Sequence, residues 1–83
     1  MGKIEKLLDK ILDKRFDNNF SFNDLCKIAD YYCFKKRIKG GHFIYTFEEI
    51  PEIINLQPDS NGKAKIYQVN QMRNLILKYF VKK

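Results

Sequence analysis

Apolar residues near the start of the chain recur at the spacing of an α-helix. They follow the i, i+3, i+4, i+7, i+8 pattern, and lysine and aspartate fill most of the intervening positions. The pattern predicts an amphipathic helix within residues 1–16, which the polar stretch 17–19 should stop. The apolar residues of this stripe are Ile4, Leu7, Leu8, Ile11 and Leu12.

Two further helices are expected, one before and one after the middle of the chain. Ser21 suits an N-cap, with Asp24 in the capping-box position, so a helix should run from about Phe22 to Tyr31 or Tyr32. A last helix is expected from about Tyr67 to Val81. Its inner stripe would consist of Val69, Met72, Ile76, Tyr79 and Phe80.

Between these helices the hydrophobic period changes from about 3.6 to 2, as in strands. A strand should end at Lys39, and Gly40-Gly41 is typical of a two-residue hairpin turn. In the next strand Phe43, Tyr45 and Phe47 should share one face, while His42, Ile44 and Thr46 share the other. Residues 48–51 are expected as a loop because proline cannot donate to a ladder, and residues 53–57 as a third strand.

The order helix–helix–strand–strand–strand–helix predicts one α+β domain over residues 1–83. The economical arrangement is a three-stranded antiparallel sheet with helices packed on one face. The core should lie between the sheet and the second and last helices. Its expected members are Leu25, Ile28, Ile44, Leu56, Val69, Met72 and Ile76.

Charge is unevenly distributed along the chain, which has a net charge of +6. Residues 1–34 sum to zero, residues 35–42 contribute +4, residues 43–62 contribute −4 and residues 63–83 contribute +6. Basic charge that is concentrated in separate segments of the chain favours an anionic partner, either nucleic acid or an acidic protein. The alternative is a solvated basic surface that keeps the protein soluble.

Several function classes are disfavoured by composition. No apolar run approaches the ~18 residues of a membrane span, and no signal-peptide core precedes residue 15, so we expect a cytoplasmic protein. Cys26 and Cys33 are seven residues apart, which matches neither a CxxC redox motif nor a zinc pattern. We therefore expect buried, reduced thiols, no metal and no cofactor.

The single histidine, His42, follows the Gly-Gly turn and a basic strand. A neutral imidazole can take a proton from a ribose 2′-hydroxyl, and the imidazolium can return one to the leaving 5′-oxygen. Lys35, Arg37 or Lys39 could then hold the scissile phosphate. The alternatives are an exposed turn histidine without a chemical role and a charged edge strand that blocks aggregation.

Two other groups of residues are candidates for contact with RNA. Phe43, Tyr45 and Phe47 could stack bases, although their alternation favours core packing. Lys63 and Lys65 precede the last helix, a place from which phosphate contacts often come. Solvated lysines are an equal alternative there.

Taken together, these motifs resemble the HicA family of bacterial toxins. The similarity covers about residues 21–81, and the helix within residues 1–16 would be an N-terminal addition. The segments that carry the resemblance are Arg37-Ile38-Lys39-Gly40-Gly41-His42, Phe43-Ile44-Tyr45, Glu52-Ile53-Ile54-Asn55-Leu56-Gln57-Pro58, Gly62-Lys63-Ala64-Lys65, Tyr67-Gln68-Val69 and Leu75-Ile76-Leu77-Lys78.

The resemblance implies a double-stranded-RNA-binding-domain-like αβββα fold. It also implies the toxin of a type II toxin–antitoxin system, an endoribonuclease that cleaves mRNA without a metal and arrests growth. A HicB-type antitoxin would cover its active face. The catalytic histidine of the family maps onto His42, and the expected RNA-binding residues are Lys35, Lys36, Arg37, Lys39, Gly40, Gly41, Lys63 and Lys65.

The chain departs from the family pattern at two positions. The usual Gly-Ser-His is here Gly40-Gly41-His42, and the common second histidine is Phe43. Glycine at position 41 removes a hydroxyl that could contact phosphate and loosens the turn. A non-catalytic RNA-binding module with the same fold is therefore the alternative function.

Overall fold

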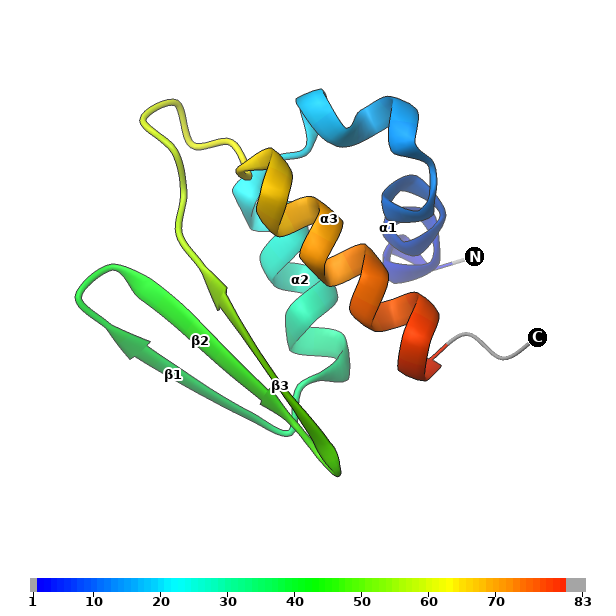
Figure 1. Cartoon of the computed structure of the whole chain (residues 1–83). Coiled ribbons are helices and arrows are strands. Elements are labelled where there is room, and N and C mark those ends of the chain that lie inside the picture. The colour runs from blue at the N-terminus through cyan, green and yellow to red at the C-terminus, as the bar shows by residue number, and fades with distance from the viewer. Residues whose placement is uncertain (1, 81–83) are drawn as a thin grey trace.

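The computed structural model describes residues 2–80, and its elements follow the order that the hydrophobic pattern predicts (Figure 1). The expected helix end at Val81 lies outside these residues. In chain order the elements are α1 (Lys3–Leu12), a 3-10 helix η1 (Lys14–Asn19), α2 (Phe22–Tyr32), β1 (Lys35–Lys39), β2 (His42–Phe47), β3 (Ile50–Leu56), α3 (Ile66–Leu75) and a π-helical continuation η2 (Ile76–Phe80).

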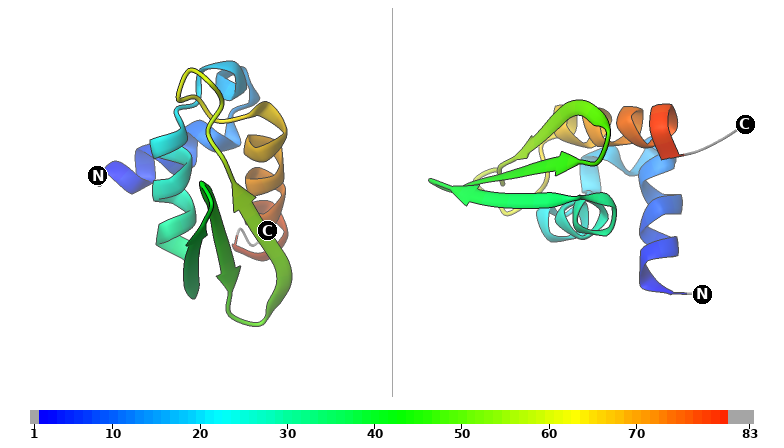
Figure 2. Two further views of the ribbon diagram at one scale, coloured as in Figure 1. Left: turned by 90° about the vertical axis from the view of Figure 1, so that its left-hand side faces the viewer. Right: turned by 90° about the horizontal axis from the view of Figure 1, so that it is seen from below.

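The three strands form one antiparallel sheet in the order β1-β2-β3, as predicted. Lys39 lies opposite His42, and Ile44 lies opposite both Arg37 and Asn55. Helices α2 and α3 cover one face of this sheet, and α1 packs on the far side of these helices (Figures 1 and 2). The β1–β2 hairpin extends beyond the helical layer, with its turn farthest from α1 (Figure 2).

The core lies between the sheet and the helices. Of the predicted members, Leu25, Ile28, Leu56, Val69, Met72 and Ile76 are buried. The prediction for Ile44 is wrong, because this side chain is half-buried on the opposite face of the sheet. Its neighbour Tyr45 is fully buried toward the helices, and successive side chains of a strand point to opposite faces.

The N-terminal segment is tied into this core by a buried arginine. Arg73, which is only 4% exposed, pairs with Asp17 through both ends of its guanidinium, at Nη1–Oδ1 2.8 Å and Nη2–Oδ2 3.1 Å. Its Nη1 also donates to the carbonyl of Ile11 at 3.2 Å, one of the last carbonyls of α1. These bonds satisfy a helix C-terminus with a cation, as the helix dipole favours.

Two element boundaries differ from the prediction. Helix α1 ends at Leu12 rather than near residue 16, because Asp13 accepts a hydrogen bond from the backbone N–H of Arg15 and begins η1. Strand β3 begins at Ile50, where a loop was expected. Pro51 is accommodated for two reasons. Strand β3 is an edge strand, and its pairing with β2 is irregular between the Phe47–Ile50 and Tyr45–Ile54 pairs.

The neighbouring residues Ile76 and Leu77 allow a direct test of the core. Ile76 is 1% exposed, whereas Leu77 is 44% exposed. We expect Ile76→Ala to lower the free energy of unfolding by about 2–5 kcal/mol, because it removes buried methyl groups and leaves a cavity. Thermal denaturation should show a large fall in Tm for Ile76→Ala and little change for Leu77→Ala. Equal shifts in the two variants would contradict the burial of Ile76 in the core.

Candidate functional site

His42 begins β2, directly across the hairpin turn from Lys39. Gly40 and Gly41 both have positive φ, at 56° and 82°, which is the geometry of a type I′ turn. Glycine suits these positions because other residues rarely adopt such angles. The glycine at position 41 therefore fits the turn rather than loosening it, and the predicted two-residue hairpin is confirmed.

The sheet face that the helices leave uncovered carries His42 together with three cations. We call this surface the open face. Among the strand residues 35–39, 42–47 and 50–56, the alternation places no aspartate or glutamate on this face, so these strands give it positive charge. Its members are Lys35, Arg37 and Lys39 from β1, His42, Ile44 and Thr46 from β2, and Ile53 and Asn55 from β3.

Asn55 holds the imidazole of His42. The Nδ1 atom of His42 lies 3.1 Å from the side-chain oxygen of Asn55. An amide oxygen only accepts hydrogen bonds, so this contact fits a proton on Nδ1, and Nε2 takes no part in it. Asn55 is not among the site residues predicted from sequence, although an asparagine inside an apolar strand is unusual enough to indicate a special role.

A shallow groove runs along the open face beside this pair. It has a volume of about 240 Å³ and is lined by Lys35, Arg37, Ile44, Thr46 and Ile53. The hydroxyl of Thr46 donates to the carbonyl of Lys35 at 3.2 Å. The groove thus combines two apolar side chains with two cations.

Lys36 does not join the other basic residues of β1. Its Nζ lies 3.1 Å from a carboxylate oxygen of Asp30 in α2, and 5.8 Å from the centre of the Tyr45 ring. Both contacts are on the helix side of the sheet. The structure therefore brings Lys35, Arg37 and Lys39 together with His42 and places Lys36 on the opposite face.

The aromatic residues of β2 also face the helices. Tyr45 and Phe47 are buried, and the ring of Phe43 makes an edge contact with Phe22 of α2 at 5.3 Å between centroids. Burial raises the pKa of the Tyr45 phenol, which keeps it protonated. Core packing is confirmed for Tyr45 and Phe47, whose rings are inaccessible to a base, and Phe43 is half-buried at the edge of the same core.

Lys63 and Lys65 lie in the segment before α3. A carboxylate oxygen of Asp59 accepts hydrogen bonds from the backbone N–H groups of Lys63 and Asn61, both at 2.8 Å, and these bonds lower the pKa of Asp59. Lys65 Nζ lies 3.4 Å from the side-chain oxygen of Gln57. Gln57 directly follows β3, whose last residue pairs with Phe43, so Lys65 lies at the same end of the sheet as His42.

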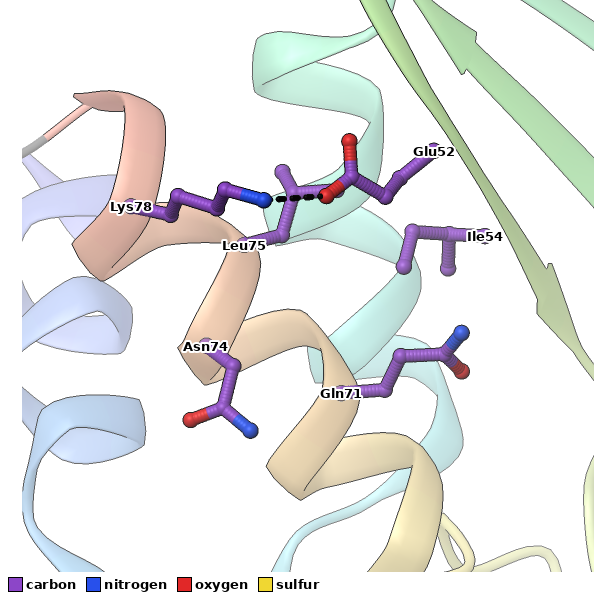
Figure 3. A pocket seen from close by; sticks show the side chains of 6 residues that line it. All are labelled: Glu52, Ile54, Gln71, Asn74, Leu75 and Lys78. Carbon is purple, nitrogen blue, oxygen red and sulfur yellow. Dashed lines mark hydrogen bonds and ion pairs between the residues drawn. The ribbon is translucent and has the colours of Figure 1, made fainter.

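Arg73 and Lys78, the other basic residues of positions 66–80, pair with groups of the protein itself. Arg73 is buried, and Lys78 Nζ lies 3.0 Å from Glu52 Oε2 (Figure 3). The Tyr79 hydroxyl and Lys78 both bond to Glu52 and lower its pKa. This pair lines a pocket of about 310 Å³ between β3 and α3, but the two charges neutralise each other there. This pocket between β3 and α3 therefore offers less for catalysis than the open face.

The two cysteines are free thiols and only partly buried, and burial raises the pKa of each. Within residues 2–80, no three histidine, cysteine, aspartate or glutamate side chains come together in a way that could hold a metal ion.

Comparisons of the chain with protein-family models, with curated proteins and with solved structures give no match. None of the helices described in residues 2–80 has the length and apolar character needed to cross a membrane.

Proposed function

We propose that this protein is an endoribonuclease that cleaves mRNA without a metal, as HicA toxins of bacterial type II toxin–antitoxin systems do. The observation that carries the proposal is the His42–Asn55 pair on a positive, uncovered sheet face. The α+β architecture, with helices on one face of the sheet, is compatible with the double-stranded-RNA-binding-domain-like fold that the resemblance implies. An mRNA substrate would place the activity in the cytoplasm.

In the proposed reaction, His42 acts first as a base and then as an acid. Its Nε2 takes the proton of a ribose 2′-hydroxyl while the 2′-oxygen forms a bond to the adjacent phosphorus. The bond from phosphorus to the 5′-oxygen breaks, and the imidazolium gives its proton to that oxygen. The products are a 2′,3′-cyclic phosphate and a 5′-hydroxyl end.

The cations of the open face would stabilise the charge that develops on the phosphate. Lys39 lies directly across the turn from His42, and Arg37 lies opposite Ile44, two residues further along β2. Lys65 and Lys63 would contact the RNA chain beyond this end of the sheet. Gly40 and Gly41 carry no side chain, so the backbone of the turn is accessible to a phosphate.

The same surface without proton transfer would make a non-catalytic RNA-binding module, which is the second candidate function. Both functions use the open face, and they differ only in the chemistry of His42. The conformation of Gly41 does not distinguish RNA binding from RNA cleavage. The hairpin turn forms with glycine at this position and does not need the serine that is usual in the family.

The resemblance adds an inhibitor, a HicB-type antitoxin with an acidic surface. A positive face attracts such a partner and speeds its association. The proposed contact surface is the open face with Lys35, Arg37, Lys39 and His42, so that binding would exclude RNA.

Replacing His42 tests the catalytic proposal. We expect wild-type protein to cleave single-stranded RNA in the presence of EDTA and to arrest bacterial growth when expressed. His42→Ala should lower the cleavage rate by about 10²–10⁴-fold and relieve the arrest, because it removes the proton-transfer group. Asn55→Ala should lower the cleavage rate less than His42→Ala does. The RNA fragments that the wild-type protein produces should end in a 2′,3′-cyclic phosphate. A folded His42→Ala variant that cleaves RNA as fast as the wild type would disprove the catalytic role. If the wild-type protein does not cleave RNA, and both it and His42→Ala still bind RNA, the protein is the non-catalytic binding module.

The two faces of β1 provide a matched test of RNA binding. Neutralising Lys35, Arg37 and Lys39 with glutamine should flatten the slope of log affinity against log salt concentration, because fewer phosphate counterions are released. Lys36→Gln is the control, since Lys36 is held by Asp30 on the helix side. An unchanged slope in the triple variant, or an equal effect of Lys36→Gln, would place the RNA elsewhere.

Chemical modification tests the proposed inhibitor. Diethyl pyrocarbonate modifies accessible imidazole, and His42 is the only histidine of the chain. In the complex with its cognate antitoxin, His42 should react more slowly than in the free protein, and co-expression should restore growth. Equal reaction rates together with restored growth would mean that inhibition does not work by covering His42.

A further inference from the structure

The groove of the open face contains apolar side chains that the core does not require. Ile53 is 54% exposed and Ile44 is half-buried, and both line the groove between Lys35 and Arg37. The uncovered face of an antiparallel sheet normally carries polar residues. Scattered exposed isoleucines need no explanation, but two that line one groove with cations form a surface of mixed character.

We propose that the open face binds RNA as a single strand and that this groove holds one unpaired base next to the cleaved phosphate. The inference deepens the proposed function and rests on it. Ile44 lies two residues from His42 on the same face of β2, a distance of about 7 Å along a strand. This spacing is comparable to one nucleotide step in an extended RNA strand.

The chemistry of the groove suits a nucleotide better than a peptide. A base has an apolar face that can lie on Ile44 and Ile53, and its phosphates can contact Lys35 and Arg37 at the rim. The hydroxyl of Thr46 already donates to a backbone carbonyl, so this side chain does not direct a donor toward a base edge. Recognition would therefore depend on contact with the base face and would tolerate all four bases.

The same geometry disfavours double-stranded RNA as the ligand. In a duplex both faces of each base are covered by stacking, and the base edges are paired. A base must be unstacked before it can lie flat in a groove. An acidic protein segment could use the same cations, but its binding would not depend on the presence of a base.

The test uses the full-length His42→Ala protein, which binds without cleaving. Fluorescence anisotropy should show that a labelled single-stranded RNA binds at least about tenfold more tightly than the same sequence in a blunt duplex. A scan with an abasic nucleotide at successive positions of a short RNA should reveal one position at which affinity falls by roughly threefold to tenfold. The scan is then repeated with a strand that is 2′-deoxy except for a single ribose. Wild-type protein could cleave this strand only at the ribose, which fixes the position of the sensitive nucleotide relative to the cleaved phosphate.

Ile53→Ser in the same background links the abasic effect to the groove. This variant should lose affinity for the intact RNA, and the abasic nucleotide should then have little additional effect. Leu77→Ser is the control, because Leu77 is similarly exposed but lies in η2, away from the open face. Its affinity and abasic effect should match the parent.

Three results would overturn the inference. They are equal affinity for duplex and single strand, no position-specific abasic effect, and equal behaviour of Ile53→Ser and Leu77→Ser. Absence of RNA binding at low salt would also overturn it and would leave the face to an acidic protein. The first three results are separate from the proposed function, because binding is measured without cleavage, whereas absence of RNA binding would contradict both. A wild-type protein that binds through the groove but does not cleave would contradict catalysis alone.

Discussion

Because α2 and α3 cover only one face of the sheet, each strand divides its side chains between a buried side and an open side. Tyr45 and Phe47 enter the core, and their neighbours His42, Ile44 and Thr46 are directed away from it. A shift of one residue in the pairing of β2 would bury His42 and expose the aromatic rings, which the burial energy of those rings opposes. The same packing that stabilises the domain therefore presents the imidazole.

Net charge alone overstates how many cations remain available for a ligand. Arg73 is buried and joins α1 and η1 to the core, while Lys36 and Lys78 pair with Asp30 and Glu52. The ion pairs of Lys36 and Lys78 are exposed and contribute little to stability, but they place these cations away from the open face. The open face keeps its three basic residues beside the histidine because the strand alternation puts no acidic group among them.

The pairing of β2 with β3 orients the imidazole of His42, which would otherwise be a free side chain next to the hairpin turn. Asn55 lies thirteen residues from His42 in the chain, yet the register Ile44–Asn55 brings its amide to Nδ1. This contact engages Nδ1 and leaves Nε2 out of it, the atom that the proposed chemistry needs. The isoleucine groove beside it arises from the same register, since Ile44 and Ile53 come from these two strands.

Local sequence determined much of this protein: the N-cap at Ser21, the Gly40-Gly41 hairpin and the alternation of β2 all act within a few residues, and each was predicted. The basic strand and His42 could be singled out for the same reason. Only the tertiary structure decided that Lys36 pairs with Asp30, that Arg73 is buried, that Pro51 fits an irregular edge strand and that Asn55 holds His42. These features depend on how different elements pack and pair with one another, and periodicity within one element carries no information about which side chains of another element it will meet.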